Sequence, residues 1–198
     1  MNKVKEFERL LANFYGAPYA VAVDCCTHAI ELCLRLTDAN WVTCPANTYV
    51  SVPMTFEKLG LNWGWGFTQQ QWENYYKIGN TNIIDAAVYW KRNSYIAGTL
   101  MCLSFQFKKH LSLGRGGMIL LDDEKQYNKL CKMRYDGRID DAPWAEQDID
   151  TIGYHYYMTP EIAQTGIYRF AAAERYEPRK WSYQDYPDLS KMKVFKDE

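Results

Sequence analysis

Residues 99–123 read TLMCLSFQFKKHLSLGRGGMILLDD, two short apolar runs separated by a loop rich in lysine and glycine. Apolar runs of this length bounded by turn residues are typical of buried strands, so we predict strands at 99–106 and 116–123. Lys109 lies between the first strand and the glycines, held close to the backbone and partly removed from water. Desolvation lowers the pKa of a lysine and makes its amine nucleophilic. Taken alone, however, the pattern favours a surface pair, Lys108 and Lys109, before a glycine hairpin.

Short apolar strands alternate with amphipathic helices along the rest of the chain. This alternation predicts an α/β fold, a mostly parallel sheet flanked by helices on both faces. The predicted helices are 3–15, about 27–37, 48–59, 124–135 and about 160–173. The other predicted strands are 20–23, 41–45, 61–67 and 82–87, and residues 69–77 are predicted as a weak helix or a loop.

Four residues fall at or just past the ends of predicted strands: Asp24, Pro45, Asp85 and Ser104. In open α/β sheets, ligands bind outside the carboxyl ends of the strands. We therefore expect these four residues to meet at one rim of the sheet, where they would border a ligand site.

The composition is that of an ordinary soluble globular protein, with 47% hydrophobic and 24% charged residues. The net charge is −1 and no basic tract is present, so we do not expect nucleic-acid binding. No apolar run is long enough for a membrane helix, and the N-terminal residues lack the apolar core of a signal peptide. We therefore expect a cytoplasmic protein.

Six cysteines are present, but no C-x-x-C pair and no histidine cluster accompanies them. Neither disulfides nor a metal site are therefore expected. The adjacent pair Cys25 and Cys26 is the one place where the cysteines suggest a closer look.

The stretch from Ser104 to Gly117 resembles the signature S-F-H-x-x-K-N-L-T-x-G-E-G-G of the DegT-type sugar aminotransferases. These are fold type I enzymes that use pyridoxal 5′-phosphate (PLP). The register places the family's Schiff-base lysine at Lys109. The residues that fix this register are Ser104, Phe105, Gly114, Gly116 and Gly117. Departures from the signature occur at Gln106, His110 and Arg115.

The segment 24–30, DCCTHAI, is similar to S-S-G-T-A-A-L of the same family and follows a similar opening helix and strand at 7–23. In relatives, the helix N-terminus of this segment binds the cofactor phosphate through free backbone N–H groups. Thr27 is retained and Cys26 stands in place of the glycine. The resemblance assigns both to cofactor binding, with Ser104 as another phosphate ligand.

Two further motifs concern the cofactor ring. Residues 44–50 resemble P-A-N-T-F/Y-V, which implies that Tyr49 stacks on the pyridine ring. Residues 83–87 resemble V-I-E-D-A-A, which implies that Asp85 pairs with the protonated ring nitrogen and so maintains the electron sink of the cofactor. Val88 stands where relatives often carry His or Gln. Without the resemblance, Tyr49 fits a helix packed in the core and Asp85 fits a helix cap.

A fifth motif, residues 152–159, resembles L-G-Y-N-Y-R-M-T. In relatives the Asn of this motif reaches the phosphate of the neighbouring subunit, and here His155 takes its place. The resemblance therefore implies a homodimer with a shared active site. Tyr157 replaces an Arg, and His155 also fits a surface loop.

Together these motifs predict a PLP-binding domain over residues 1–173, like the large domain of fold type I transferases, and a polar C-terminal tail over 174–198. The predicted function is transfer of an amino group from glutamate to a nucleotide-linked keto sugar, with Lys109 and Asp85 as catalytic residues. The alternative is a catalytically degenerate PLP-binding or assembly protein of the same fold. Departures at Cys26, Val88, Arg115 and Tyr157 favour that alternative.

Overall fold

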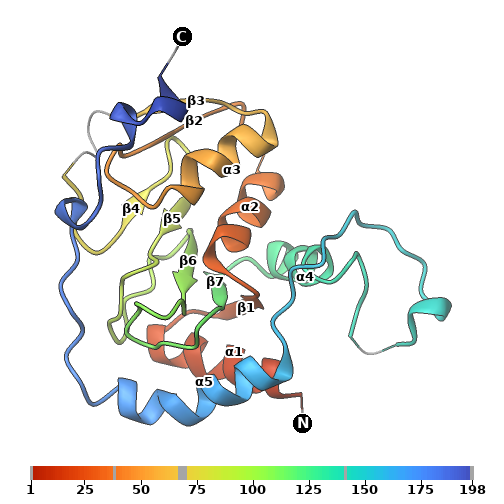
Figure 1. Ribbon diagram of the computed structural model, residues 1–198. Helices are drawn as coiled ribbons and strands as arrows, with labels where there is room; N and C mark the ends of the chain where they lie inside the picture. Colours follow the sequence, from red (N-terminus) through yellow and green to blue (C-terminus); the bar gives the residue numbers. More distant parts are fainter. Residues whose placement is uncertain (1, 38, 67–70, 141, 197–198) are drawn as a thin grey trace.

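The computed structural model describes residues 2–37, 39–66, 71–140 and 142–196, and a five-stranded sheet lies at its centre (Figure 1). Within this sheet the strand order is β1-β7-β6-β5-β4. The strands are β1 (Tyr19–Val23), β4 (Tyr76–Lys77), β5 (Ile83–Asp85), β6 (Leu100–Ser104) and β7 (Gly117–Leu121). A separate pair, β2 (Trp41–Cys44) and β3 (Asn62–Trp65), runs parallel.

The predicted α/β class with helices on both faces is confirmed, but the prediction of mostly parallel pairing is wrong. Only β5 and β6 pair in parallel within the central sheet, whereas β1 with β7, β7 with β6 and β4 with β5 are antiparallel. Parallel neighbours need a long crossover, usually a helix. The loop 105–116 between β6 and β7 contains no helix, so β7 returns beside β6 in the opposite direction.

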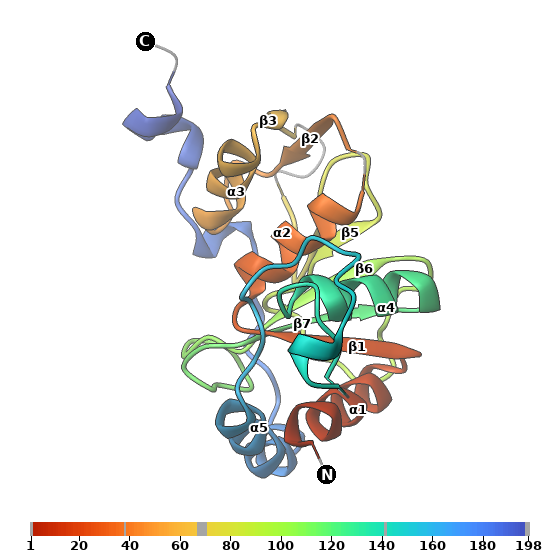
Figure 2. The same cartoon turned by 90° about the vertical axis from the view of Figure 1, so that its right-hand side faces the viewer.

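Helices cover both faces of the sheet, as Figures 1 and 2 show. Helices α1 (Lys3–Tyr15) and α5 (Pro160–Ala173) pack together on one face, and α2 (Cys26–Leu36) and α4 (Glu124–Met133) cover the other. Strand β1 shows why both faces are apolar. Ala20 and Ala22 enter the core under α1, while Val21 and Val23 enter the core under α2, because successive strand side chains point to opposite faces.

Close contact between α1 and α5 depends on Gly166. A Cβ atom at this position would lie 2.6 Å from Cε2 of Phe7, whose side chain is fully buried. The glycine therefore lets the two helices approach beneath the sheet.

Several element boundaries differ from the sequence prediction. Helix α3 (Ser51–Leu59) starts later than 48, which places Pro53 in the first turn, where backbone N–H groups have no partner within the helix. Residues 71–75 form no helix and lead into β4, while 69–70 lie outside the described residues. Strand β3 spans only part of 61–67, and residue 67 is not described.

A buried ion pair ties α1 and α4 to β1. Arg134 contacts Glu8, and Ala22 of β1 donates its N–H to Glu8 Oε1 (2.7 Å) and accepts from Arg134 at its carbonyl (2.6 Å). These bonds satisfy the two buried charges. They also fix the strand that leads directly into the N-terminus of α2.

The segment after α5 runs up one side of the molecule to β3 (Figure 1, blue). It contains short 3-10 turns at Tyr183–Asp185, Leu189–Lys191 and Lys193–Phe195, and another such turn, Trp144–Glu146, lies in the loop after α4. Backbone bonds hold the segment in place: Asn74 donates to Trp181, Tyr183 to Trp72, and Leu189 to Ala46.

All six cysteines are free thiols. Within the described ranges, no helix has the length and apolar character needed to cross a bilayer.

Candidate functional site

A cavity of about 900 Å³ opens at the carboxyl ends of β5 and β6 and reaches the N-terminus of α2. Asp85 and Ser104 line it, as the rim prediction requires. Asp24 is bonded to the lining residues His28 and Arg115, and Pro45 is not among the lining residues. Of the residues predicted to bind the cofactor, six line this cavity: Cys26, Thr27, Tyr49, Asp85, Ser104 and Lys109.

Lys109 reaches the cavity from the loop between β6 and β7. Its backbone N–H donates to the Gln106 carbonyl (2.8 Å), and the ring of His110 bonds the Ala173 carbonyl at the end of α5 (2.7 Å). Burial lowers the pKa of Lys109, against the opposing effect of the charge on Asp85. A lysine in such surroundings carries more neutral amine, the form that attacks a carbonyl, than a surface lysine does.

Asp85 lies at the end of β5, buried in the cavity wall with 7% of its surface exposed. The Tyr76 hydroxyl donates to Oδ2 (2.6 Å) and the Ala87 N–H donates to Oδ1 (3.0 Å). Burial raises the pKa of Asp85, and these two hydrogen bonds and Lys109 oppose that rise. The cavity is therefore lined by both a buried carboxyl and a half-buried amine.

The N-terminus of α2 forms another part of the wall. Cys25 is the N-cap residue, and its Sγ accepts from the His28 N–H (3.5 Å). The Thr27 hydroxyl bonds Ser51 of α3 (2.8 Å), while burial holds the pKa of the Cys26 thiol well above its usual range. Cys26 is therefore a neutral thiol at this wall.

The glycine-rich loop is pressed against this helix end. A Cβ atom at Gly117 would lie 2.4 Å from the carbonyl carbon of Cys25, so no larger residue fits without moving the backbone. Gly116 has φ 144° and forms a bridge to Cys25. These two glycines therefore allow the close approach of the loop to the N-terminus of α2.

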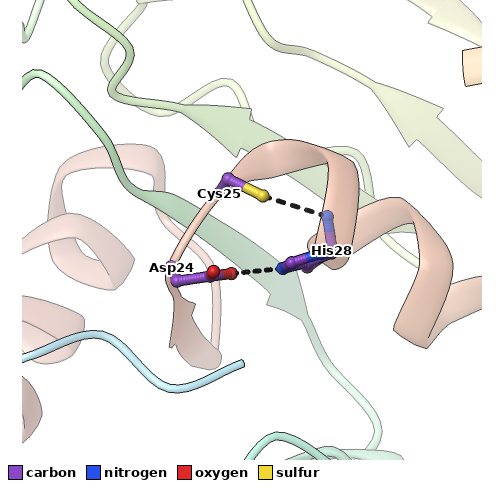
Figure 3. Close-up of side chains that lie close together, drawn as sticks. All are labelled: Asp24, Cys25 and His28. Atoms are coloured by element: carbon purple, nitrogen blue, oxygen red, sulfur yellow. Dashed lines mark hydrogen bonds and ion pairs between the residues drawn. The ribbon is translucent and has the colours of Figure 1, made fainter. Parts of the chain in front are cut away.

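Three residues with metal-ligating side chains meet beside this helix end, as Figure 3 shows. The ligand atoms of Asp24, Cys25 and His28 lie within 4.8 Å of one another. His28 Nδ1 is 2.6 Å from Asp24 Oδ1, and Arg115 donates to Asp24 Oδ2 (2.7 Å). Burial alone would lower the pKa of His28, but the hydrogen bond to Asp24 raises it to about 9. With His28 protonated and Arg115 beside it, the cluster carries a net positive charge, which favours an anion over a metal cation.

Of the two remaining predicted residues, Tyr49 lies at the cavity and His155 lies away from it. Tyr49 lies at the cavity with 55% of its surface exposed, so its ring is free to contact a bound molecule. His155 does not line the cavity of its own chain; its side chain is 69% exposed and bonds Asp136 (3.0 Å). Its predicted contact with a second subunit stays a prediction.

Sequence reasoning missed the contribution of the C-terminal segment. Trp181 lines the cavity, with the Lys109 ammonium 5.2 Å and the Arg179 guanidinium 4.1 Å from its ring centre. Arg179 also forms an ion pair with Asp185. The abundance of aromatic residues in this segment was the available signal, but no spacing rule indicates which ring faces a ligand. The other lining residues that the sequence did not single out include Thr48, Trp72, Asn74, Tyr76, Asp185, Tyr186 and Pro187.

The fold is similar to that of several solved structures, among them AtS13, the sugar aminotransferase CalS13 and a 3-amino-5-hydroxybenzoic acid synthase. AtS13 from Actinomadura melliaura superimposes with a TM-score of 0.77 at 21% identity, over 88% of this chain and 61% of AtS13. CalS13 from Micromonospora echinospora gives 0.70 at 15% identity, over 88% of this chain and 61% of that one. The 3-amino-5-hydroxybenzoic acid (AHBA) synthase gives 0.68 at 19%, over 87% and 57%. The chain thus spans about three fifths of the length of these structures, and the likeness establishes the fold.

No curated protein matches the chain. A family model does: that of the DegT/DnrJ/EryC1/StrS aminotransferases matches residues 1–62 and 87–187. These ranges contain the α2 N-terminus, the glycine-rich loop with Lys109, and most of the cavity wall. The chain therefore belongs to the DegT/DnrJ/EryC1/StrS aminotransferase family.

Proposed function

We propose that this chain binds PLP covalently through Lys109 and transfers an amino group from glutamate to a keto sugar linked to a nucleotide. The observation that carries the proposal is that the half-buried amine of Lys109 and the buried carboxyl of Asp85 line the same cavity. Family membership and the solved PLP and PMP forms of the putative sugar aminotransferase Spr1654 from Streptococcus pneumoniae support it.

The residues present fit PLP. The cavity of about 900 Å³ is large enough for a cofactor and part of a substrate. The Lys109 amine is suited to carbonyl attack, and Asp85 accepts a hydrogen bond from a ring nitrogen. Tyr49 supplies an exposed ring that could stack on the cofactor, and Cys26, Thr27 and Ser104, which line the cavity, would hold the phosphate near the α2 N-terminus. His28 and Arg115 add positive charge there.

PLP supplies an electron sink when its ring nitrogen is protonated. Asp85 maintains that protonation through its negative charge. The free amine of Lys109 would act as general base and then as general acid: it would take the proton from the α-carbon of the donor and deliver it to C4′ of the cofactor. Trp181 and the C-terminal segment limit the access of water to Lys109.

The direct test follows the amino group. With glutamate and PLP, the protein should form one 2-oxoglutarate for each cofactor converted to its amine form, and a keto sugar nucleotide should then restore the visible band. Lys108→Ala, which removes the neighbouring exposed lysine, is the matched control for Lys109→Ala. Glutamate that leaves the band unchanged would contradict the proposed donor.

We also propose a cytoplasmic homodimer in which His155 of the partner subunit completes the phosphate site. His155 lies away from its own cavity and is exposed. Mixing Lys109→Ala with His155→Ala chains tests the arrangement, because one of the two sites in a mixed dimer then keeps both residues. Partial recovery of activity on mixing is expected, and no recovery from chains shown to exchange would contradict the shared site.

The second candidate is a PLP-binding or assembly protein without catalysis. The departures at Cys26, Val88, Arg115 and Tyr157 favour it. A Lys109-dependent visible band that no amino donor alters would identify this case.

A further inference from the structure

Tyr76 is held directly opposite Asp85. The two residues are register partners in the antiparallel pair of β4 and β5, so their side chains leave the sheet on the same face. The Tyr76 hydroxyl lies 2.6 Å from Asp85 Oδ2, and the two residues are only 5% and 7% exposed. Because a carboxylate only accepts hydrogen bonds, the proton in this contact belongs to Tyr76.

The Tyr76 hydroxyl is itself hydrogen-bonded to the hydroxyl of Thr48. Thr48 Oγ1 lies 2.5 Å from the Tyr76 hydroxyl, and Thr48 is 2% exposed. Since the Tyr76 hydroxyl donates its hydrogen bond to Asp85, the Thr48 hydroxyl must donate to Tyr76. With the Ala87 N–H on Oδ1, each carboxylate oxygen has one fixed donor and a free lone pair for another N–H.

Tyr76 and Asp85 lie outside the ranges that the family model matches, whereas Thr48 and Ala87 lie inside them. The family match leaves out residues 63–86, which contain β4 and Tyr76. Both Tyr76 and Thr48 line the cavity with Asp85 and Lys109. This chain of hydrogen bonds is therefore part of the cavity wall as well as of the core.

We propose that Tyr76, supported by Thr48, is a positioning residue that fixes the Asp85 carboxylate and keeps it charged toward the ring nitrogen of the cofactor. The statement that the Asp85 carboxylate faces the cofactor rests on the proposed function. The statement that Tyr76 fixes this carboxylate does not. Burial raises the pKa of Asp85, and the hydrogen bond from Tyr76 is the first of the interactions that oppose this rise.

The test compares Tyr76→Phe with Tyr15→Phe. Both remove a hydroxyl from a buried tyrosine, but Tyr15 donates to the Tyr89 carbonyl and does not line the cavity. Carbon-13 NMR of the aspartate carboxyls, without added cofactor, follows the titration of Asp85. Tyr76→Phe should move that titration to higher pH, Thr48→Val should move it less, and Tyr15→Phe should leave it in place.

PLP affinity is the second readout. Loss of a hydrogen bond to a charged group should weaken PLP binding by about tenfold in Tyr76→Phe and leave Tyr15→Phe unchanged. An Asp85 titration unchanged in Tyr76→Phe would overturn the positioning role. Failure of the unaltered protein to bind PLP would overturn the proposed function, and this separate measurement does not depend on the titration.

Discussion

The ammonium group of Lys109 lies 5.2 Å from the centre of the Trp181 ring, which belongs to the segment that follows α5. This contact brings Trp181 of the C-terminal segment to the amine that the family signature identifies. The ring stabilises a cation, but it also excludes water. Burial lowers the pKa of Lys109.

Removal of this ring should therefore change the reactivity of Lys109. In Trp181→Ala water reaches the amine, so the pKa of Lys109 should rise toward its ordinary value. The pH dependence of amine labelling at Lys109, followed by peptide mass spectrometry, should move to higher pH. Trp144→Ala removes an exposed tryptophan that does not line the cavity and should have no effect. A profile that moves to lower pH would show that the cation–π contact outweighs burial.

The Asp24 and His28 pair should make stability depend on pH. The folded pKa of His28, about 9, is above its unfolded value, so this contribution is complete below about pH 6.5 and is lost as pH rises through 9. Burial alone would raise the pKa of Asp24, but hydrogen bonds from His28 and Arg115 lower it, so its contribution is lost in acid.

Asp24→Asn tests this linkage. The variant should bring the pKa of His28 down and reduce the free energy of unfolding at neutral pH by about 1–2 kcal/mol, a value discounted for partial exposure. Proton NMR of the His28 ring measures the first effect and urea denaturation the second. Asp136→Asn, which removes the partner of His155, should leave the His28 titration unchanged. A His28 titration unaltered in Asp24→Asn would contradict the linkage.

Gly117→Ala should damage the site more than the fold around it. The added methyl group would lie 2.4 Å from the Cys25 carbonyl carbon, so the glycine-rich loop and the α2 N-terminus must separate. PLP affinity should fall by tenfold or more, on the order of the 1.4 kcal/mol that one misplaced polar contact costs. Gly64→Ala places its methyl group at ordinary contact distance, 3.4 Å from Trp41, and serves as the control. Equal PLP affinities for the two variants would contradict the close approach.

The buried pair of Glu8 and Arg134 should be important for stability. Arg134→Met leaves Glu8 buried without its partner charge, which should lower the free energy of unfolding by about 3–5 kcal/mol. Arg35→Met is the control, because Glu31 keeps its second partner, Lys58. Urea denaturation compares the two, and an equal loss would show that the burial of Glu8 is not decisive.

The sequence predicted much of the site because its signals are local. Lys109 is located by residues on both sides of it, and Asp85 by the apolar strand that ends there. The strand order was not predictable from local pattern, since β7 pairs with β1 across nearly 100 residues. Thr48 and Tyr76 also escaped notice, because their bond spans 28 positions and buried hydroxyls have no periodic pattern.

The position of the C-terminal segment was likewise not predictable from local sequence. Its composition predicted only a polar C-terminal tail, whereas in the structure Leu189 is almost fully buried and Trp181 lines the cavity. Composition describes only the average environment of a segment. The position of this C-terminal segment is fixed by contacts such as its backbone hydrogen bonds with residues 46, 72 and 74.

The most direct test of the central claim is the visible absorption spectrum of the purified protein with added PLP, measured beside Lys109→Ala and Lys108→Ala. The account predicts a yellow band in the unaltered protein and in Lys108→Ala, and none in Lys109→Ala. A band that persists in Lys109→Ala, or that is absent from all three proteins, would contradict covalent binding of PLP at Lys109.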